Sequence, residues 1–483
     1  MRFFLSAYIY LKPEMDPLHH IHHTHHMHHG AAKQRSMLEG SIWKGIVSFA
    51  VPIFFGNLFQ QLYNTADTLI VGNFIGKEAL AAVSSSGNLI FMIIGLLNGM
   101  AMGAGVIIAK YFGAKDNANL STAVHTDLAF SVIAGLVLTV VGVVFTPHIL
   151  RWMGTPENVL PNSIAYFRTY FFGVTAVFIY NVATGILQAV GDSRHPLYYL
   201  IISSLINVVL DLLFVGVMGF GVASAAAATV ISQAVSAVLC LRRLIRSDDV
   251  YKVSPRKIRI NGSMLRQIVR FGLPSGVQNS LIGFANVMVQ TNINSFGSDA
   301  MAGCGSYSKV EGFAFLPITC FAMALATFVS QNLGAKQYDR VKRGSRFGIA
   351  TSVILAELVG VLIWLCAPFL IALFNSDPDV CAFGIRQART EALFYCLLAM
   401  SHCFAGIFRG AGRAFVPMLI MMICWCLIRV TYISIAVPYF RDIVIVFSAY
   451  PITWFLSSVI FIIYYFRADW IHTFDRLDEK AHR

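Results

Sequence analysis

Long runs of apolar residues follow one another along this chain, separated by short polar or basic connections. A run of about 20 mostly apolar residues is long enough for a helix to cross the hydrocarbon core of a bilayer. We therefore predict twelve membrane-spanning helices. Their approximate centres are Phe59, Leu97, Ala134, Thr175, Val208, Ser232, Ala285, Phe321, Val359, Met400, Arg429 and Val459.

The second half of the chain repeats the first. Residues 185–196 read GILQAVGDSRHP, and residues 406–417, 221 positions later, read GIFRGAGRAFVP. The same shift aligns the GAK triplet at 113–115 with that at 334–336. Each copy holds six predicted spans, and an even number returns the chain to its starting side, so both copies share one orientation. We predict an all-α integral membrane protein of two six-helix lobes, related by a pseudo-twofold axis along the membrane normal.

This pattern divides the chain into five segments. We expect a low-complexity extension at 1–36, an N-lobe at 37–246, a basic inter-lobe loop at 247–264, a C-lobe at 265–467 and a tail at 468–483. The extension has a His-His-x rhythm between residues 19 and 29, a composition that can bind metal. Because no neighbouring residue fixes a coordination geometry, we interpret it as a low-complexity leader.

Composition and charge support a membrane protein. Charged residues make up 12% of the chain and hydrophobic residues 57%, whereas soluble domains have about 25% charged residues. The net charge of +12 is concentrated in alternate connections, above all between residues 242 and 270. By the positive-inside rule, both termini are then cytoplasmic. The charge thus encodes topology and predicts no nucleic-acid partner, and most of the nine cysteines lie in apolar spans without metal-ligand spacing.

Two acidic residues lie inside the predicted spans of the first half. Asp67 shares a helix face with Gln60 and Asn64, because Asn64 and Asp67 follow Gln60 by four and seven residues. In the fifth span, Asn207 and Asp211 are four residues apart and also share a face. A carboxylate at bilayer depth is costly unless it is paired, hydrated or neutralised, so both acids are candidate functional residues.

The oxygen atoms of these side chains suit a small hard cation or a proton. With Thr229 of the sixth span, the two acids and Asn207 supply most of an oxygen shell for Na⁺, and two adjacent carboxylates can instead take up a proton near neutral pH. Pro52, in the same span as Asp67, frees a backbone carbonyl and offers a place to bend. The alternative is that the two acids are polar residues at helix contacts.

The second copy lacks this acid pair. Asp67 aligns with Val289 or Met288, and Asp211 aligns with Tyr432. The duplication therefore predicts cation coupling in the N-terminal half. Neutral polar residues of other spans are candidates to line a central cavity, and with the two from the first span they are Gln60, Asn64, Asn181, Asn279, Asn286 and Gln290.

The second half has intramembrane charges of its own. Arg429 lies in the middle of the eleventh span and needs an acidic partner, for which Glu311 and Glu391 are candidates. Since charges inside membranes usually pair, we expect a structural ion pair.

Several motifs resemble those of the multidrug and toxic compound extrusion (MATE) transporters. They are Pro52, QQLYN at 60–64, Asp67, VG at 71–72, GKEALAAV at 76–83, the GAK triplets, and Gly191-Asp192 with its second-half counterpart. The resemblance covers residues 38 to about 467 and is strongest to the bacterial multidrug-export type.

This resemblance implies two lobes that face a central cleft and cation-driven export of drugs by alternating access. The ligands of the N-lobe cation site in some members correspond to Asp67, Asn207, Asp211 and Thr229, and Pro52 corresponds to a proline associated with bending of the first helix. Other members have acids on helices seven and ten, where this chain has Ile282 and Arg413.

We interpret the chain as a monomeric antiporter of the bacterial cytoplasmic membrane that exports amphipathic, cationic drugs in exchange for H⁺ or Na⁺, without a cofactor. One alternative is a lipid-linked oligosaccharide flippase, which needs several basic residues in its cavity; Arg429 and Lys309 are the main candidates. An intramembrane enzyme needs a catalytic motif such as HExxH or GxSxG, and neither occurs. A receptor or scaffold does not explain an acid pair kept in one half of a duplication.

Overall fold

The computed structural model describes residues 37–483, apart from residues 76, 153–154, 156, 158 and 482–483. The histidine-rich segment therefore lies outside the described residues. Within the described part, every regular element is a helix.

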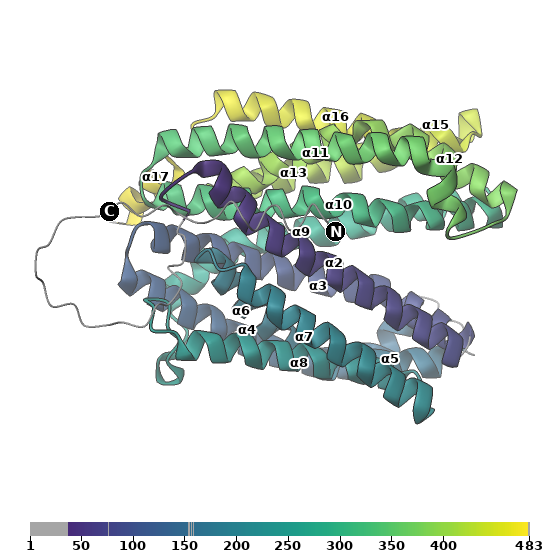
Figure 1. The fold of residues 1–483 in the computed structure, drawn as a ribbon, viewed down its shortest axis with the longest axis horizontal. Coiled ribbons are helices and arrows are strands. Elements are labelled where there is room, and N and C mark those ends of the chain that lie inside the picture. The colour runs from purple at the N-terminus through teal and green to yellow at the C-terminus, as the bar shows by residue number, and fades with distance from the viewer. Residues whose placement is uncertain (1–36, 76, 153–154, 156, 158, 482–483) are drawn as a thin grey trace, which may run out of the picture. The chain divides into compact units, whose positions relative to one another are not determined.

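The N-lobe consists of seven α-helices and one π-helix in the described residues, which lie largely side by side (Figure 1). A bend of 46° separates α5 from α6, and the two helices together are long and apolar enough to make one span. The elements are α2 (Ile42–Phe74), α3 (Lys77–Gly113), α4 (Asn117–Trp152), α5 (Leu160–Phe172), α6 (Val174–Ala189), α7 (Arg194–Asp211), the π-helix η1 (Leu212–Val217) and α8 (Ala223–Arg246).

The C-lobe follows a connection that contains the short 3-10 helix η2 (Pro255–Lys257). Its last element, α17, lies beyond the final span. The elements are α9 (Gly262–Asn294), α10 (Ser298–Gly334), α11 (Tyr338–Ala372), α12 (Pro378–Glu391), the 3-10 helix η3 (Ala392–Phe394), α13 (Tyr395–Gly410), α14 (Phe415–Met421), the π-helix η4 (Met422–Ile428), α15 (Arg429–Phe440), α16 (Ile443–Arg467) and α17 (Thr473–Ala481).

The sequence repeat is visible in the backbone. Helices α3 and α10 each have 37 residues, and α6 and α13 each have 16. The turns after these helices also match, because Lys115 and Lys336 have φ angles of 57° and 56°. Gly191 and Gly412 likewise share positive φ, a conformation that glycine adopts without a steric penalty. The predicted duplication is therefore confirmed.

The described part contains ten helices that are long and apolar enough to span a membrane, and the bent α5–α6 pair adds one more. The remaining predicted span is α9, whose 33 residues make a helix about 50 Å long. Its apolar run is interrupted by polar residues such as Asn279, Asn286 and Gln290. Its length and its place in the repeat make it the counterpart of α2.

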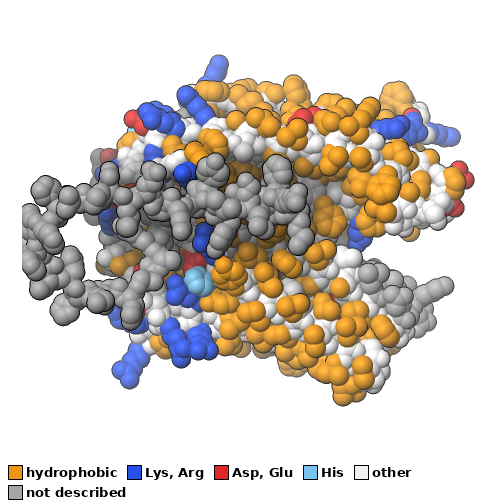
Figure 2. Space-filling view, viewed as in Figure 1, with side chains coloured by type: hydrophobic (Ala, Val, Ile, Leu, Met, Phe, Trp, Pro, Cys, Tyr) orange, Lys and Arg blue, Asp and Glu red, His pale blue; other side chains and the backbone are white. Residues whose placement is uncertain are grey.

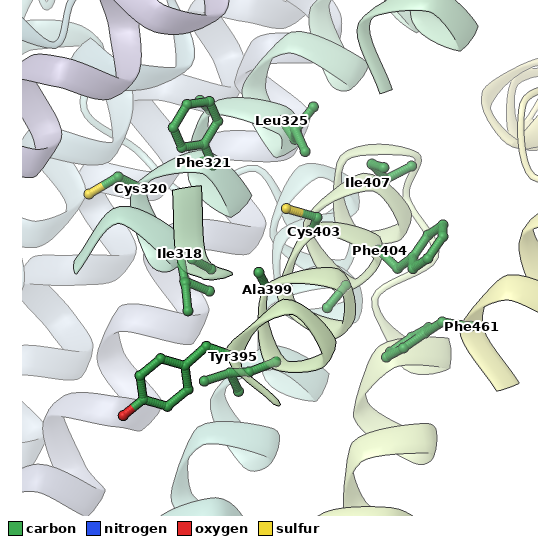
Figure 3. Packing of buried hydrophobic residues seen from close by; sticks show 14 of the residues in the cluster. Ile318, Cys320, Phe321, Leu325, Tyr395, Ala399, Cys403, Phe404, Ile407 and Phe461 are labelled. Atoms are coloured by element: carbon green, nitrogen blue, oxygen red, sulfur yellow. The ribbon is translucent and has the colours of Figure 1, made fainter. Parts of the chain in front are cut away.

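Each lobe has its own apolar core. In the C-lobe, residues of α10, α13 and α16 interdigitate, as Figure 3 shows for Ile318, Leu325, Phe404 and Phe461. The outer faces of α4 and α11 expose large apolar side chains such as Val140 and Leu358. Hydrophobic side chains dominate the face seen in Figure 2, as expected for helices that face lipid.

The first helix of each lobe crosses from one core to the other. Ile46, Phe49 and Ile53 of α2 pack into the C-lobe core, whereas Ile70 and Val71 near its end pack against α5 and α8 of the N-lobe. The second copy shows the same crossing in α9, which begins in the N-lobe core and ends in the C-lobe. A bend in either helix therefore changes how the lobes are connected.

The two lobes meet tightly near the end of the bundle where α2 begins and α16 ends, which we call the basic end. Most of the Lys and Arg side chains visible in Figure 2 lie there. Gly99 and Gly103 of α3 face Gly276 and Gly272 of α9 so closely that a Cβ atom on either α3 residue would overlap the α9 backbone. This packing requires small residues and closes the bundle at the basic end.

Candidate functional site

A cavity of about 740 Å³ lies between the lobes. Helices α2, α3, α5, α6, α7 and α8 supply its N-lobe wall, and α9, α10 and α13 supply its C-lobe wall. The lining is rich in tyrosine and amide side chains, with Met102 and Met323 from opposite lobes. Such a surface offers apolar contact area together with adaptable hydrogen bonding.

Asp67 lies in this lining, and Asp211 lies behind it, fully buried. Their carboxyl groups face each other closely enough to share a hydrogen bond when one of them holds a proton. When both are ionised, neither Asp211 oxygen nor Oδ1 of Asp67 has a hydrogen-bond donor. Two facing carboxylates without donors repel each other, and a proton or a cation between them relieves that repulsion.

Asn207 and Thr229 complete the predicted group. Asn207 lies one turn before Asp211 on α7, is 1% exposed, and has no hydrogen-bond partner for either side-chain atom. Thr229 lines the cavity on α8, and its Oγ1 donates to the carbonyl of Ala225. An apolar cluster that joins Ile70 and Val71 of α2 to Ala225 and Ala226 of α8 brings these helices together.

The atoms without partners fit a small cation. Oδ1 of Asp67, both carboxylate oxygens of Asp211 and Oδ1 of Asn207 are buried acceptors without donors, and hard cations such as Na⁺ take oxygen ligands of this kind. In the described residues, no group of three or more His, Cys, Asp or Glu side chains could hold a metal ion.

Four of the six predicted polar positions line the cavity: Gln60, Asn64, Asn181 and Asn279. Asn279 also donates to the carbonyl of Gly95 at 3.4 Å, so it joins α9 to α3 as well. Asn286 and Gln290 are different: both are exposed and outside the cavity lining, and Gln290 donates to Asn294. The polar stripe of α9 continues beyond the end of the cavity, so its spacing alone misplaced these two residues.

Pro52 lines the cavity at the point where α2 leaves the C-lobe core. Helix α2 continues through it to Phe74. The position predicted for a bend therefore lies between the segment seated on the C-lobe and the segment that carries Asp67. Because proline lacks an N–H group, one backbone hydrogen bond of the helix is absent there.

Arg429 is buried in the C-lobe and lies outside the cavity lining. Its guanidinium donates to Oγ1 of Thr453 at 2.8 Å and lies 4.2 Å from the ring centre of Tyr450. No ion pair joins it to Glu311 or Glu391 in the described part of the chain; Glu391 instead accepts from Gln387. The predicted direct ion pair is thus replaced by a hydroxyl and an aromatic face, although both acids are close enough to interact electrostatically.

Sequence reasoning missed several residues of the lining. Tyr166 and Tyr170 of α5 are buried beside the acid pair, and Tyr63 accepts a hydrogen bond from Gln233. The C-lobe wall contains His402 and Arg409, both from α13. The repeat contained a signal for Arg409, because its counterpart in the first copy is Gln188, which also lines the cavity.

Comparison with known proteins identifies several relatives. A family model described as MatE matches residues 52–213 and 274–434. The probable multidrug resistance protein YoeA of Bacillus subtilis is 30% identical over 433 residues, which cover 88% of this chain and 94% of the relative. The probable multidrug resistance protein NorM of Thermotoga maritima is 26% identical over 83% of this chain and 87% of its own length.

Solved structures share the fold. A MATE protein in a straight conformation superposes with a TM-score of 0.85 and 25% identity, covering 92% of this chain and 99% of that one. The outward-facing conformation of a multidrug resistance MATE family transporter gives a TM-score of 0.86 at 24% identity, covering 92% of this chain and 99% of that one.

Proposed function

This chain belongs to the MatE family, whose model it matches in both lobes, and from that premise we propose that it is a cation-coupled antiporter that exports amphipathic organic compounds. The relatives are named multidrug resistance or export proteins, and these names are consistent with a transporter rather than an enzyme. The observation that carries the coupling proposal is the buried pair Asp67 and Asp211, which lacks hydrogen-bond donors and reaches the central cavity through Asp67.

The pair couples cation and drug because binding of a cation to the two acids changes the charge that the cavity wall presents to the drug. A proton, or Na⁺ held by Asp67, Asn207, Asp211 and Thr229, neutralises charge and satisfies the oxygens that otherwise have no partner. When the pair is empty, Asp67 presents a negative charge that attracts a cationic drug. Drug and cation then compete for the same wall, and such competition produces exchange.

Helix α2 connects this event to the lobes. Its first half is seated on the C-lobe, and its second half carries Asp67 against the N-lobe. Pro52 lies between the two halves and can absorb a change in direction. Cation release therefore acts through α2 on the packing that closes the basic end, which is how we expect access to alternate.

We propose that the basic end faces the cytoplasm of a bacterium and that the protein works as a monomer in the cell membrane. The positive-inside rule supports this orientation, because the α8–α9 and α10–α11 connections at this end are rich in Lys and Arg. A charge that crosses a potential of 100 mV releases about 2.3 kcal/mol, equivalent to roughly a fiftyfold concentration ratio.

The test is efflux of a fluorescent organic cation from proteoliposomes under separately imposed Na⁺ and pH gradients. We expect gradient-driven export by wild type and its loss in Asp67→Asn and Asp211→Asn. A matched control is Glu357→Gln, an intramembrane acid of α11 outside the cavity lining, which accepts from the backbone of Cys396. If both Asp variants exported under a gradient as well as wild type does, the coupling proposal would be wrong.

A further inference from the structure

Arg409 places a positive charge in the cavity wall near the basic end. It is the second-last residue of α13, it is 8% exposed, and its Nε atom has no hydrogen-bond partner. Among the charged residues Asp, Glu, Lys and Arg, the described lining contains only Asp67 and Arg409. The cavity is therefore dipolar, with an acid from the N-lobe and a guanidinium from the C-lobe.

No acidic residue of the described chain pairs with Arg409. The neighbouring arginines of this lobe have partners, since Arg413 donates to Thr473 and Arg429 donates to Thr453. A buried guanidinium without an anion or a full set of acceptors destabilises the folded protein. Such unpaired charges inside membranes usually have a function. The missing partner is therefore one that enters the cavity.

His402 extends this polar surface. It lies seven residues before Arg409 on α13, two helical turns away on the same face, and it lines the same cavity. Its ring makes T-shaped contacts with the rings of Phe315 and Trp425, and its Nε2 atom is buried without a partner. Two side chains with ring or guanidinium nitrogens, His402 and Arg409, thus lie on the same stretch of the cavity wall.

The fold does not require a positive charge at this position. The repeat gives Arg409 a counterpart in Gln188, which is the second-last residue of the equivalent helix α6 and lines the same cavity. The same helix terminus, followed by the same positive-φ glycine, is thus built around a neutral amide in the first copy. The positive charge of Arg409 is therefore not needed for folding, and we attribute it to binding in the cavity.

The two charged ends are well separated. Pro52, near the basic end of the cavity, and Asp67 are fifteen residues apart on α2, so the cavity extends over about 20 Å. An anion bound by Arg409 therefore does not neutralise the acid pair. Aromatic and methionine side chains between the two ends suit an organic body.

We propose that Arg409, together with His402, is a subsite for the acidic group of an amphipathic substrate, so that the cargo includes zwitterionic organic compounds as well as cations. The proposal rests on the proposed export function and specifies its substrate class. A carboxylate bound to the guanidinium forms charge-assisted hydrogen bonds in the geometry that carboxylates and guanidinium groups share. The body of the substrate then occupies the apolar wall.

Two dyes that differ only at the acidic group provide the test. Rhodamine 110 has a free carboxylate, and rhodamine 123 is its methyl ester. Binding of each dye to the purified full chain is followed by fluorescence anisotropy for wild type, Arg409→Gln, which copies the residue of the first lobe, and Arg409→Lys. We expect Arg409→Gln to lose at least tenfold more affinity for the acid than for the ester, and Arg409→Lys to recover part of that loss.

The outcomes separate the two proposals. Equal losses for both dyes in Arg409→Gln would show a purely structural role, and no loss for either would exclude contact; both results overturn the subsite. Competition by chloride alone, without discrimination between acid and ester, would make the site one for an inorganic anion and would also overturn it. If wild type exported rhodamine 123 but did not bind rhodamine 110, the subsite proposal would be wrong and the export proposal would stand. If wild type bound neither dye, the result would count against both the subsite and the export proposal.

Discussion

At the scale of single residues, Asp211 combines full burial with missing hydrogen-bond donors, and Asp67 faces it from the cavity lining. Asp211 is 0% exposed and neither of its oxygens has a partner, and Asn207 beside it is equally unsatisfied. A folded protein tolerates such a site when the destabilisation serves a function. The same argument makes the pair a target for stabilising substitutions.

Asp211→Asn should raise stability while it abolishes coupling. The amide can donate to Asp67, and it removes one of two facing charges, so we expect a gain of about 1–3 kcal/mol at pH 8 without Na⁺. The apparent melting temperature of the detergent-solubilised protein measures this gain. A lower melting temperature together with intact gradient-driven export would contradict the account.

A second acid illustrates ordinary stabilisation outside the spans. Asp192, between α6 and α7, accepts from the backbone N–H of His195 and bonds its ring at 2.6 Å. Burial raises the pKa of Asp192, but these hydrogen bonds and the nearby charges of His195 and Arg243 lower it more, so the net pKa lies below 3.8. A depressed carboxyl pKa contributes stability above the unfolded-state value, and this contribution is lost as pH falls through the folded-state pKa.

Asp192→Asn should therefore destabilise the protein near neutral pH, by about 1.5–3 kcal/mol for a charge-assisted hydrogen bond. The difference in melting temperature between wild type and variant should be fully present near pH 5 and shrink below about pH 4. If the difference in melting temperature grew as the pH fell, the lowered pKa of Asp192 would not be its cause.

At the scale of helices, the apolar runs predicted nearly every span, and the repeat predicted their pairing. Helix α9 is the one predicted span that is not among the described helices apolar enough to cross a membrane. Its polar residues face the cavity or solvent, while its other faces pack on α3. Periodicity indicates which residues share a face but not which neighbour that face meets. For this reason the sequence does not show that Asn286 and Gln290 lie outside the cavity or that Arg429 meets Thr453 and Tyr450. The family resemblance and the spacing together predict that Asp67 and Asp211 come together from two helices.

The glycine contact between α3 and α9 gives a prediction at this scale. In Gly103→Ala, the new methyl group would overlap the backbone of Gly272 and Phe271, which cannot yield as a side chain would. We expect a loss of about 1–3 kcal/mol of packing energy and a larger share of molecules open at the basic end. Spin labels at the exposed residues Ala118 and Arg343 measure the separation of the lobes.

The matched control is Gly105→Ala, where the nearest atom, the carbonyl oxygen of Gly185, is 3.7 Å from the added Cβ. This variant should keep the wild-type distance distribution. If Gly103→Ala gave the same distribution as Gly105→Ala, the glycine contact would not control closure.

At the scale of the whole molecule, the lobes are joined at the basic end by more than α3 and α9. Helix α17 contacts both lobes: Asp478 pairs with Lys110 of α3 at 2.6 Å, Asp475 accepts from Tyr338 of α11, and Leu477 packs against both cores. The sequence suggested only a tail here, since a helix of 9 residues beyond the last span has no membrane signal. Its position stabilises the state in which the basic end is closed.

Lys110→Gln should weaken this closure modestly. Lys110 is largely buried but Asp478 is exposed, so the pair contributes at most about 1 kcal/mol, or a fivefold change in population. The same spin-label distances report the change. Lys252→Gln, which removes an exposed pair on the inter-lobe connection, should leave the distances unchanged, and an equal effect of both variants would contradict a specific role for α17.

Drug and cation should exclude each other at Asp67 and Asp211, so the binding of a drug should release the bound ion. Calorimetric titration with rhodamine 123 in buffers of different ionisation enthalpy counts protons, and a sodium electrode counts Na⁺. We expect wild type to release about one H⁺ or Na⁺ per drug bound and Asp67→Asn and Asp211→Asn to release none. Release by both variants at the wild-type stoichiometry would show that the exchanged ion is held elsewhere.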